Sequence, residues 1–503
     1  MAAAFGVAGQ GFGHAAVSPE TGAQGKAAWR VATDTQGDGT MDDYDLVVIG
    51  SGPSGRRAAI QAAKIGKRVL VVEKSAHVGG VSVHTGTMPS KTLRETVLNL
   101  TGWRERGFYG ADYRVDADID RADLALRVRA TLTHEVEVLL DQFARNGVEV
   151  AAGCAAFVDP HVIAITAADG EVRRVRAAHV VIAVGTAPFR PETIPFNGID
   201  VVDSDTLLSA PTLAGSIAVV GAGVIGIEYA TILSALDAHV TLIEPRNSFL
   251  DFVDAGIIAE FTRQLVTRGV DIRLGSGLAG VDRGGDGRPV VVLEDGTRIA
   301  VDMVLYAAGR MGATPGLGLE NAGLATDGRG RLAVDPASFQ TAVPHIYATG
   351  DVVGFPALAS TSLEQGRIAA CHAFGLAPPP PPANFPYGIY SVPEISTVGL
   401  AEEAATAKGI ATLVGIAPLA ETSRGHIMGL DSGLLKLVFA ADDHRLLGVH
   451  IIGEGATELV HIGQAVINLG GGLDFFMENS FNYPTLAEAY KTAALAAWNS
   501  IAA

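Results

Sequence analysis

The chain has 503 residues, of which 48% are hydrophobic and 18% charged, and its formal net charge is −17. This length is enough for roughly three domains of about 150 residues each. The negative charge argues against nucleic acid and anionic membranes as partners, because the surface as a whole repels them. Only two cysteines occur, Cys154 and Cys371, which excludes a disulfide framework and a cysteine-based zinc site. We expect both to be small buried hydrophobic residues, no metal site among the 13 histidines, and a cytoplasmic protein.

Residues 1–40 are rich in Gly, Ala, Thr and Gln and show no hydrophobic periodicity. They also lack the basic start and apolar run of a secretory signal. We therefore expect a disordered N-terminal extension, or a native protein that begins at Met41, directly before the first predicted strand.

The first predicted element is an apolar strand, residues 45–49, that runs into the motif Gly50-x-Gly52-x-x-Gly55. A helical stretch follows, and a second strand then ends at Glu73. In a dinucleotide site the first glycine permits a tight turn, the second lets the backbone approach a pyrophosphate, and the third lets the helix pack closely on the strand. The pyrophosphate lies at the helix N-terminus, and the carboxylate accepts hydrogen bonds from ribose hydroxyls.

A second copy of this unit begins at residue 216. Its strand runs into Gly221-x-Gly223-x-x-Gly226, and its second strand ends at Glu244. The acidic residue follows the first glycine by 23 positions in both copies. The window 217–233 is the most apolar of the chain but contains Glu228, which predicts a buried strand and helix rather than a membrane span. Two dinucleotide sites imply a bound redox cofactor and a diffusible nucleotide.

A third segment, residues 345–370, is predicted as a strand that runs into Thr349-Gly350-Asp351 and then a long helix. An aspartate at such a strand end can bind a polyhydroxyl chain, as the ribityl chain of FAD requires. The same tripeptide is also a common turn, so both interpretations stay open at this point.

Together these segments resemble the flavoprotein disulfide reductases, the family of lipoamide dehydrogenase and glutathione reductase, over residues 43–500. The resemblance implies an α/β fold with two Rossmann-like dinucleotide-binding domains, for FAD and NAD(P), and a C-terminal α+β dimerisation domain. The implied domains are FAD-binding over 41–205 and 333–383, NAD(P)-binding over 206–332 and dimerisation over 384–503. The second FAD-binding part ends in the proline-rich linker 378–382. Residues 180–188 and 304–314 resemble the crossovers between the two nucleotide domains, and 388–400 and 481–490 resemble the dimerisation domain.

The segment GGVSVHTGTMPSK, residues 79–91, departs from the family at two decisive positions. In disulfide reductases it reads GGxCxxxxCxPSK, and both cysteines face the flavin. Alignment on Pro89-Ser90-Lys91 places Ser82 and Thr87 at these positions. A hydroxyl cannot form a disulfide or act as the thiolate of thiol exchange.

The acid–base histidine of the family, in the pattern HPTxxE, is also replaced. Tyr483 occupies its place, although Glu488 remains. A phenol with a reference pKa near 10 is a poor proton shuttle at neutral pH. With both the thiol and the proton relay missing, we expect no disulfide reduction.

The residues that serve the flavin itself are retained. Lys91 resembles the lysine beside flavin N5, and Glu228 the glutamate that pairs with it, although a solvated lysine at a helix start is the alternative. One branch of the family, the soluble (Si-specific) pyridine nucleotide transhydrogenases, shares further pieces with this chain. These are the pattern HxGTxPSK from His84 to Lys91, FPALAS at 355–360, HIGQA at 461–465, and FNYPT and AEAY within 481–490.

The motifs and the resemblance together predict two sets of cofactor residues, with no metal. For FAD these are Gly50, Gly52, Ser54, Gly55, Glu73, Lys74, Gly80, Ser82, Thr87, Lys91, Gly185, Asp351 and Ala359. For NAD(P) they are Gly221, Gly223, Ile225, Gly226, Glu244, Arg246 and Gly309. Glu244 favours NAD(H), because a carboxylate repels a 2′-phosphate, whereas Arg246 either binds that phosphate or is a solvated loop residue. His84 either borders the flavin ring or has a structural role.

The resemblance implies hydride transfer from NADPH to NAD⁺ through FAD, with one shared nicotinamide site and ping-pong kinetics. Lys91 and Glu228 are the expected catalytic pair. The alternatives are an NAD(P)H:quinone or dye reductase or an NADH oxidase on the same scaffold, and a non-catalytic flavin-binding sensor or structural subunit. The expected partner is a second copy of the chain, whose segment 481–490 completes the flavin site. No nucleic acid or membrane partner is expected.

Overall fold

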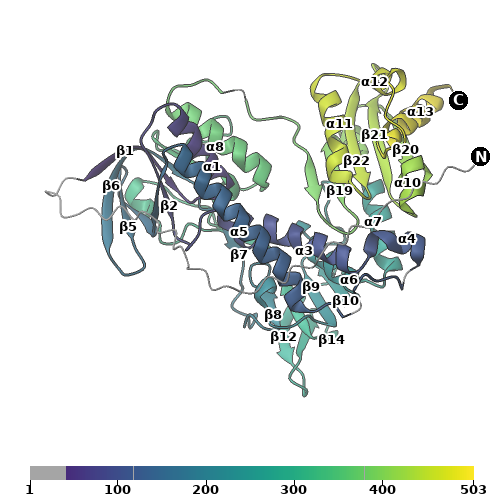
Figure 1. The fold of residues 1–503 in the computed structure, drawn as a ribbon, viewed down its shortest axis with the longest axis horizontal. Helices are drawn as coiled ribbons and strands as arrows, with labels where there is room; N and C mark the ends of the chain where they lie inside the picture. Colours follow the sequence, from purple (N-terminus) through teal and green to yellow (C-terminus); the bar gives the residue numbers. More distant parts are fainter. Residues whose placement is uncertain (1–40, 111, 117, 379, 503) are drawn as a thin grey trace, which may run out of the picture. The chain divides into compact units, whose positions relative to one another are not determined.

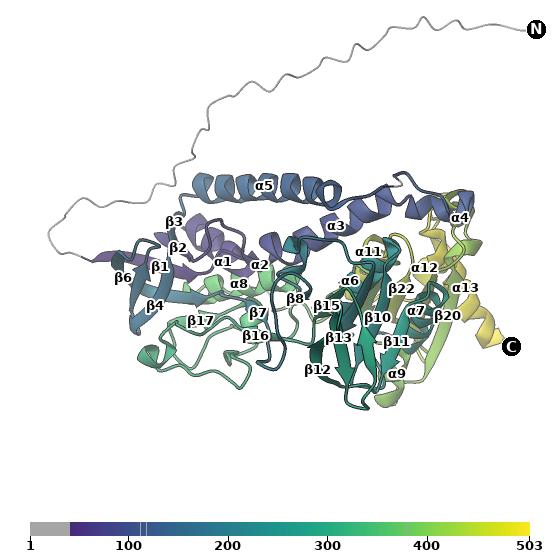
Figure 2. The ribbon, with the colours of Figure 1, turned by 90° about the horizontal axis from the view of Figure 1, so that it is seen from below.

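The structure is a computed structural model that describes residues 41–502 apart from 111, 117 and 379. The expected N-terminal extension, residues 1–40, lies outside these described residues. Two largely parallel sheets are followed along the chain by an antiparallel one, which confirms the predicted α/β class with a C-terminal α+β part. Figures 1 and 2 show the ribbon from two sides.

The first sheet has seven strands, of which five are parallel. In spatial order the parallel strands are β3 (Glu149–Ala152), β2 (Val69–Glu73), β1 (Asp42–Ile49) and β6 (Val172–Ile182), and β17 (Ile346–Ala348) also pairs with β6. The antiparallel strands β5 (Val162–Thr166) and β4 (Cys154–Asp159) extend the sheet beyond β6. Strand β2 is buried along its whole length, as expected for a parallel strand covered on both faces.

Two helices pack against each other beside this sheet. Helix α1 (Pro53–Lys64) follows the first glycine motif, and α8 (Ala359–Ala373) follows the predicted ribityl segment. A Cβ atom on Gly366 would lie 2.0 Å from the carbonyl oxygen of Ser54, so only glycine permits this approach. Helix α5 (Arg121–Arg145) begins with a capping box in which Asp120 and Asp123 each accept from the other's backbone N–H.

The second sheet is parallel throughout. Its order is β11 (Asp271–Leu274), β10 (His239–Glu244), β9 (Ser216–Val220), β15 (Met303–Tyr306) and β8 (Val201–Asp203). Helices α6 (Val224–Ala235) and α7 (Ala255–Thr267) belong to this unit, as does the antiparallel sheet of β12 (Leu278–Arg283), β13 (Pro289–Leu293) and β14 (Arg298–Ala300). The apolar window predicted as strand and helix is therefore β9 and α6.

The two segments predicted as crossovers meet each other. Strand β7 (Thr186–Pro188) pairs antiparallel with β16 (Arg310–Gly312) in a two-stranded sheet. The segment that leaves the first sheet and the segment that returns to it are therefore paired with each other. This pairing brings Gly185 and Gly309 to the same cavity.

The C-terminal sheet is antiparallel, in the order β18 (Tyr387–Ile389), β19 (Ile395–Gly399), β22 (Leu446–Ile452), β21 (Leu434–Ala440) and β20 (Thr412–Pro418). Helices α11 (Ala456–Asn468), α12 (Leu473–Glu478) and α13 (Glu488–Ala502) pack with this sheet, at the yellow end of the ribbon in Figure 1. Phe439, Val449, Phe476 and Tyr490 are buried in their common core.

The remaining helices complete the described chain. The α-helices are α2 (Gly80–His84), α3 (Thr87–Leu100), α4 (Arg106–Tyr109), α9 (Glu402–Ala407) and α10 (Ser423–Met428). The 3₁₀ helices are η1 (Trp103–Glu105), η2 (Leu207–Ser209), η3 (Leu319–Ala322), η4 (Gly350–Val353) and η5 (Leu419–Glu421).

The two cysteines differ in environment, which corrects one prediction. Cys371 is buried in α8, as expected, but Cys154 is exposed. The reason is strand alternation, since the side chains of β4 at Ala155 and Phe157 face the core and Cys154 points to the opposite face. Cys154 borders the large cavity described below.

Candidate functional site

The two predicted glycine turns have the same backbone conformation. Gly50 has φ +102° and Gly221 has φ +100°, in a region that favours glycine. A Cβ atom would lie 2.4 Å from the carbonyl oxygen of Ala183 in the first turn and 2.9 Å from that of Ala307 in the second. Each turn therefore needs glycine both for its conformation and for the close approach of a neighbouring strand.

The third glycine of each motif lets the helix lie against the turn. A Cβ atom on Gly55 would lie 2.0 Å from the carbonyl oxygen of Gly50, and one on Gly226 would lie 1.9 Å from that of Gly221. These distances are far too short for any side chain. They confirm the close packing expected from the spacing of the motif.

The second glycine of each motif leaves open space at a helix N-terminus. Gly52 precedes α1 and Gly223 precedes α6, and neither would bring an added Cβ atom within 4 Å of another atom. Neither helix start has a side-chain cap. The free N–H groups and the helix dipole favour an anion at both places, as a pyrophosphate requires.

The acidic residues at the strand ends are tied back to the glycine turns. Glu73 accepts from the backbone N–H and the hydroxyl of Ser51, at 3.0 and 2.5 Å. Glu244 accepts from the backbone N–H of Ala222 at 2.9 Å and from the side chain of Arg246 at 2.8 Å. Both carboxylates are buried, so each is fixed where the ribose of a dinucleotide is expected.

A cavity of about 1230 Å³ joins the two turns. This exceeds the few hundred to about 1,000 Å³ of most small-molecule sites and suits two long ligands. Most of the predicted residues line it: Gly50, Gly52, Ser54, Glu73, Lys74, Gly80, Ser82, Thr87, Lys91, Gly185, Asp351, Ala359, Gly223, Ile225, Glu228 and Gly309. Of the others, Gly55, Gly221 and Gly226 are packed inside the turns, and Glu244 and Arg246 lie at the far side of the second turn.

The predicted catalytic pair is formed. The ammonium group of Lys91 on α3 lies 2.8 Å from Oε2 of Glu228 on α6, and the Glu228 side chain is only 5% exposed. The other oxygen, Oε1, accepts from the backbone N–H of Tyr390 at 2.9 Å. Lys91 also lies 5.0 Å from the centre of the Tyr390 ring. A positive charge is therefore held at the cavity wall by a carboxylate whose two oxygens are both engaged.

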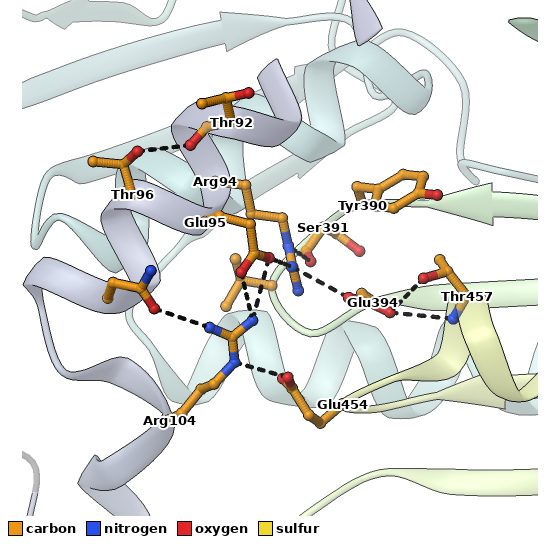
Figure 3. Close-up of polar contacts among 12 residues, drawn as sticks. Thr92, Arg94, Glu95, Thr96, Arg104, Tyr390, Ser391, Glu394, Glu454 and Thr457 are labelled. Carbon is orange, nitrogen blue, oxygen red and sulfur yellow. Dashed lines mark hydrogen bonds and ion pairs between the residues drawn. The ribbon is translucent and has the colours of Figure 1, made fainter. Parts of the chain in front are cut away.

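The loop that carries Tyr390 is itself fastened to α3, as Figure 3 shows. The buried Arg94 donates from Nε to the carbonyl oxygen of Ser391 at 2.9 Å, and its Nη1 lies 3.2 Å from Oε1 of Glu394. The other carboxylate oxygen of Glu394 accepts from the N–H and hydroxyl of Thr457 on α11. Lys91 and Arg94 lie one turn apart on α3, so one helix positions both the cavity lysine and the loop opposite it.

The positions of the family's cysteines present hydroxyl groups. Ser82 on α2 and Thr87 at the start of α3 both line the cavity, and the Ser82 hydroxyl donates to the carbonyl oxygen of Gly79 at 3.1 Å. His84 also lines the cavity, and its Nε2 lies 2.9 Å from the carbonyl oxygen of Val78. Its two predicted roles, beside a ligand and within the structure, are thus both compatible with its position.

Asp351 in η4 faces the cavity beneath the first turn. Burial raises the pKa of its carboxyl group, and the opposing effects of the Arg310 charge and the Thr186 hydroxyl are smaller. The hydroxyls of Thr85 and Tyr229, both cavity-lining residues, are buried and have no hydrogen-bond partner within the described chain. Such groups need a partner, so the cavity suits a ligand that carries several polar groups.

Sequence reasoning did not identify Thr85, Tyr229 or Arg310. No motif marks them, because their roles depend on which segments meet at the cavity. Tyr483, at the place of the family's histidine, lies elsewhere: it is 69% exposed and accepts from the Ser423 hydroxyl at 2.9 Å. Glu488 accepts from the backbone N–H of Thr485 at 3.2 Å.

Comparison with known proteins agrees with this architecture. The family profile described as pyridine nucleotide-disulphide oxidoreductase matches residues 44–366, and the profile of its dimerisation domain matches residues 385–494. The chain belongs to the pyridine nucleotide-disulphide oxidoreductase family. The predicted resemblance is thereby confirmed, together with FAD and NAD(P) as the cofactors of this scaffold.

Two curated relatives share most of the chain. The soluble pyridine nucleotide transhydrogenase of Mycobacterium tuberculosis (strain ATCC 25177 / H37Ra) is 48% identical over 464 residues, which cover 92% of this chain and 99% of the relative. The enzyme of the same name from Enterobacter sp. (strain 638) is 39% identical over 463 residues, covering 91% and 99%. Both relatives carry the name of the branch that the sequence analysis predicted, the soluble pyridine nucleotide transhydrogenases.

Solved structures have the same fold. LpdA from Mycobacterium tuberculosis superimposes with a TM-score of 0.83 at 26% identity, covering 90% of this chain and 99% of that one. The HOCl-induced flavoprotein disulfide reductase RclA from Escherichia coli superimposes with a TM-score of 0.81 at 27% identity and the same coverage. Among the helices of the described residues, none combines the length and the apolar character needed to cross a bilayer.

Proposed function

We propose that this protein transfers hydride from NADPH to NAD⁺ with FAD as its bound cofactor. The observation that carries the proposal is the wall of the large cavity. It presents the hydroxyls of Ser82 and Thr87 where disulfide reductases have cysteines, but it keeps the ion pair of Lys91 and Glu228. The relatives named soluble pyridine nucleotide transhydrogenase support the same activity.

FAD, when bound, supplies a ring that accepts hydride from a reduced nicotinamide and returns it to an oxidised one. The first glycine turn and its open helix N-terminus bind the pyrophosphate, and Glu73 binds the adenosine ribose. Asp351, with its raised pKa, and the unpaired hydroxyls of Thr85 and Tyr229 are available for polar groups of this ligand. The cradle therefore fits the group that the family uses.

Lys91 contributes a fixed positive charge at the place where negative charge develops during hydride transfer. Glu228 and the Tyr390 N–H hold the lysine still, so little reorganisation is needed. Because Ser82 and Thr87 offer no thiol, electrons have no exit through the protein to a disulfide substrate. Hydride can leave only to a second nucleotide or to another diffusible acceptor.

The second glycine turn binds both nucleotides in alternation, which predicts ping-pong kinetics. The test is an anaerobic stopped-flow series in which the enzyme is reduced with NADPH and then mixed with NAD⁺, a thionicotinamide analogue, a quinone or oxygen. Transhydrogenation requires that NAD⁺ and its analogue reoxidise the enzyme fastest. Reoxidation by quinone or oxygen that is faster by orders of magnitude indicates a reductase or an oxidase instead, and slow reduction by either nucleotide indicates a non-catalytic subunit.

The dimerisation domain makes a homodimer the functional unit, with residues 481–490 completing the flavin site of the partner. We also propose the domain limits 41–205, 206–332, 333–383 and 384–503, with one adjustment. Because β8 (Val201–Asp203) pairs with β15 in the second sheet, we move the boundary between the first two domains from residue 205 to residue 200. The cytoplasm, where both nucleotides are available, is the proposed location.

A further inference from the structure

A second cavity, of about 460 Å³, lies beside the second glycine turn. Its lining comes from the start of α6 and from the loop after β10: Gly223, Val224, Arg246, Leu250, Asp251 and Phe252. In Rossmann folds the adenosine ribose lies between the glycine turn and the acidic strand end, which here is Glu244. NADP(H) differs from NAD(H) by a 2′-phosphate on that ribose. We therefore expect the 2′-phosphate to lie in this cavity.

Arg246, the candidate ligand of the 2′-phosphate, is engaged by two carboxylates. Its Nε lies 2.8 Å from Oε1 of Glu244, and its Nη1 lies 3.4 Å from Oδ2 of Asp251. The side chains of Arg246 and Asp251 are each 55% exposed, so a ligand can reach both. Glu244, in contrast, is buried and also accepts from the backbone N–H groups of Ala222 and Arg246.

The backbone places Asp251 at this point with some strain. Leu250, directly before it, has φ +53°, a left-handed conformation that is unfavourable for a bulky side chain. A hydrogen bond of 2.8 Å from the Val253 N–H to the Leu250 carbonyl closes the turn. Strained backbone of this kind is concentrated at binding sites, where it fixes a side chain that the ligand meets.

From this geometry we infer that Asp251 sets the preference between NAD(H) and NADP(H) by competing with the 2′-phosphate for Arg246. With NAD(H), the guanidinium stays between Glu244 and Asp251. With NADP(H), it must leave both carboxylates to bind the phosphate. The inference rests on the proposed function, because it explains how one site releases NADP⁺ and then admits NAD⁺.

The competition has a consequence for turnover. A site with a free arginine binds NADP(H) tightly and releases the product slowly, so NAD⁺ enters rarely. A site with no arginine rejects NADPH. An arginine restrained by a second carboxylate gives intermediate affinity for the phosphorylated nucleotide, as alternating use of a shared site requires.

The test measures binding of two fragments to the full-length, FAD-loaded protein by titration calorimetry. The probes are adenosine 2′,5′-bisphosphate and adenosine 5′-monophosphate, which differ only in the 2′-phosphate. We expect Asp251→Asn to tighten binding of the bisphosphate about fivefold, the scale of one charge pair near a surface, and to change binding of the monophosphate less than twofold. Equal effects on both probes, or no effect on either, overturn the inference.

Two further variants show whether the effect passes through Arg246. In an Arg246→Met background, the fivefold effect of Asp251→Asn shrinks below twofold if the two residues act together. A full effect in that background means that Asp251 acts by repulsion alone and overturns the inference. The matched control is Asp271→Asn, which removes another arginine-paired carboxylate, at the start of the neighbouring strand β11 beside Thr241 and not lining the second cavity, and leaves both affinities unchanged. Because fragment binding needs no hydride transfer, these measurements test the role of Asp251 separately from the proposed transhydrogenase activity.

Discussion

The two glycine turns have nearly identical backbones but different surroundings. Around the first turn, α8 packs so closely on α1 that Gly366 nearly touches Ser54, and the carboxylate of Glu73 is satisfied by neutral donors of Ser51. Around the second turn, Glu244 is bound by the charged, half-exposed Arg246 beside an additional cavity. A closed turn suits a resident cofactor, and an open turn with an adjustable charge suits nucleotides that come and go.

The most severe test of this comparison introduces one methyl group into each turn. In Gly55→Ala and in Gly226→Ala the new Cβ atom would lie about 2 Å from a backbone oxygen, so either turn must deform. We expect the first variant to be purified without FAD, and the second to retain the visible absorbance of bound flavin but to lose reduction by NADPH almost completely. Overpacking of this kind costs about 1–3 kcal/mol in stability as well.

A matched control for these variants is Gly285→Ala, in the hairpin between β12 and β13, where an added Cβ atom meets nothing within 4 Å. It should keep both FAD and the reduction rate. Normal FAD content in Gly55→Ala, or loss of FAD in Gly226→Ala, would contradict the assignment of the two turns.

The next largest effect is expected at Lys91 on α3 and Glu228 on α6, which join the parts of the chain that carry the first and the second glycine turn. Lys91→Met removes the positive charge beside the expected flavin ring, and the loss of such preorganised stabilisation lowers rates by about 10²-fold. The rate of flavin reduction by NADPH, followed by stopped flow, measures this directly. Lys408→Met, on an exposed lysine, is the control, and a Lys91→Met enzyme as fast as the wild type would exclude the proposed role.

The glycine turns could be predicted from the sequence itself because local spacing encodes them. Each glycine motif and its acidic residue lie within one short segment, with the same interval of 23 positions between them in both copies. Ser82, Thr87, Lys91 and Glu228 were predicted from the family resemblance, and the structure places Lys91 against Glu228, 137 positions away. Here the family resemblance supplied what spacing within the chain does not contain.

The remainder depends on contacts between distant segments, which have no local signature. Arg94 binds Glu394, 300 positions further along the chain. Asp251 could be recognised as a candidate specificity residue only from the structure, where its carboxylate lies beside the guanidinium of Arg246. Cys154 was mistaken for a buried residue because composition predicts cysteine burial in general, whereas strand alternation decides the side chain's direction at each position.

A smaller, mainly structural effect is expected from Arg94, which fastens α3 to the loop of Tyr390. Arg94→Met leaves the carboxylate of Glu394 buried without its cation, and the loss of one partner of such a pair costs about 3 kcal/mol. The double variant Arg94→Met, Glu394→Met should regain part of this stability, measured as the thermal unfolding midpoint. Because the loop also presents the Tyr390 N–H to Glu228, the single variant should in addition slow flavin reduction. A double variant less stable than the single would contradict this account.

The smallest expected effect is on the pH dependence of NAD⁺ binding at the second turn, where, unlike at the first, the acidic residue is paired with an arginine. Burial tends to raise the pKa of Glu244, but the hydrogen bonds from Arg246 and Ala222 and the Arg246 charge outweigh it, so the pKa lies below the usual 4.5. The ionised form, which accepts from ribose hydroxyls, is therefore fully present above pH 4.5, and NAD⁺ affinity should be lost only as pH falls through this lowered pKa. In Arg246→Met the side-chain hydrogen bond and the charge of the arginine are gone, while the backbone hydrogen bonds to Glu244 remain, so the pKa of Glu244 should rise and the loss of affinity should begin at a higher pH than in the wild type. Titration of NAD⁺ binding between pH 4 and 7 for both proteins measures the difference, and identical profiles would show that Arg246 does not control the charge of Glu244.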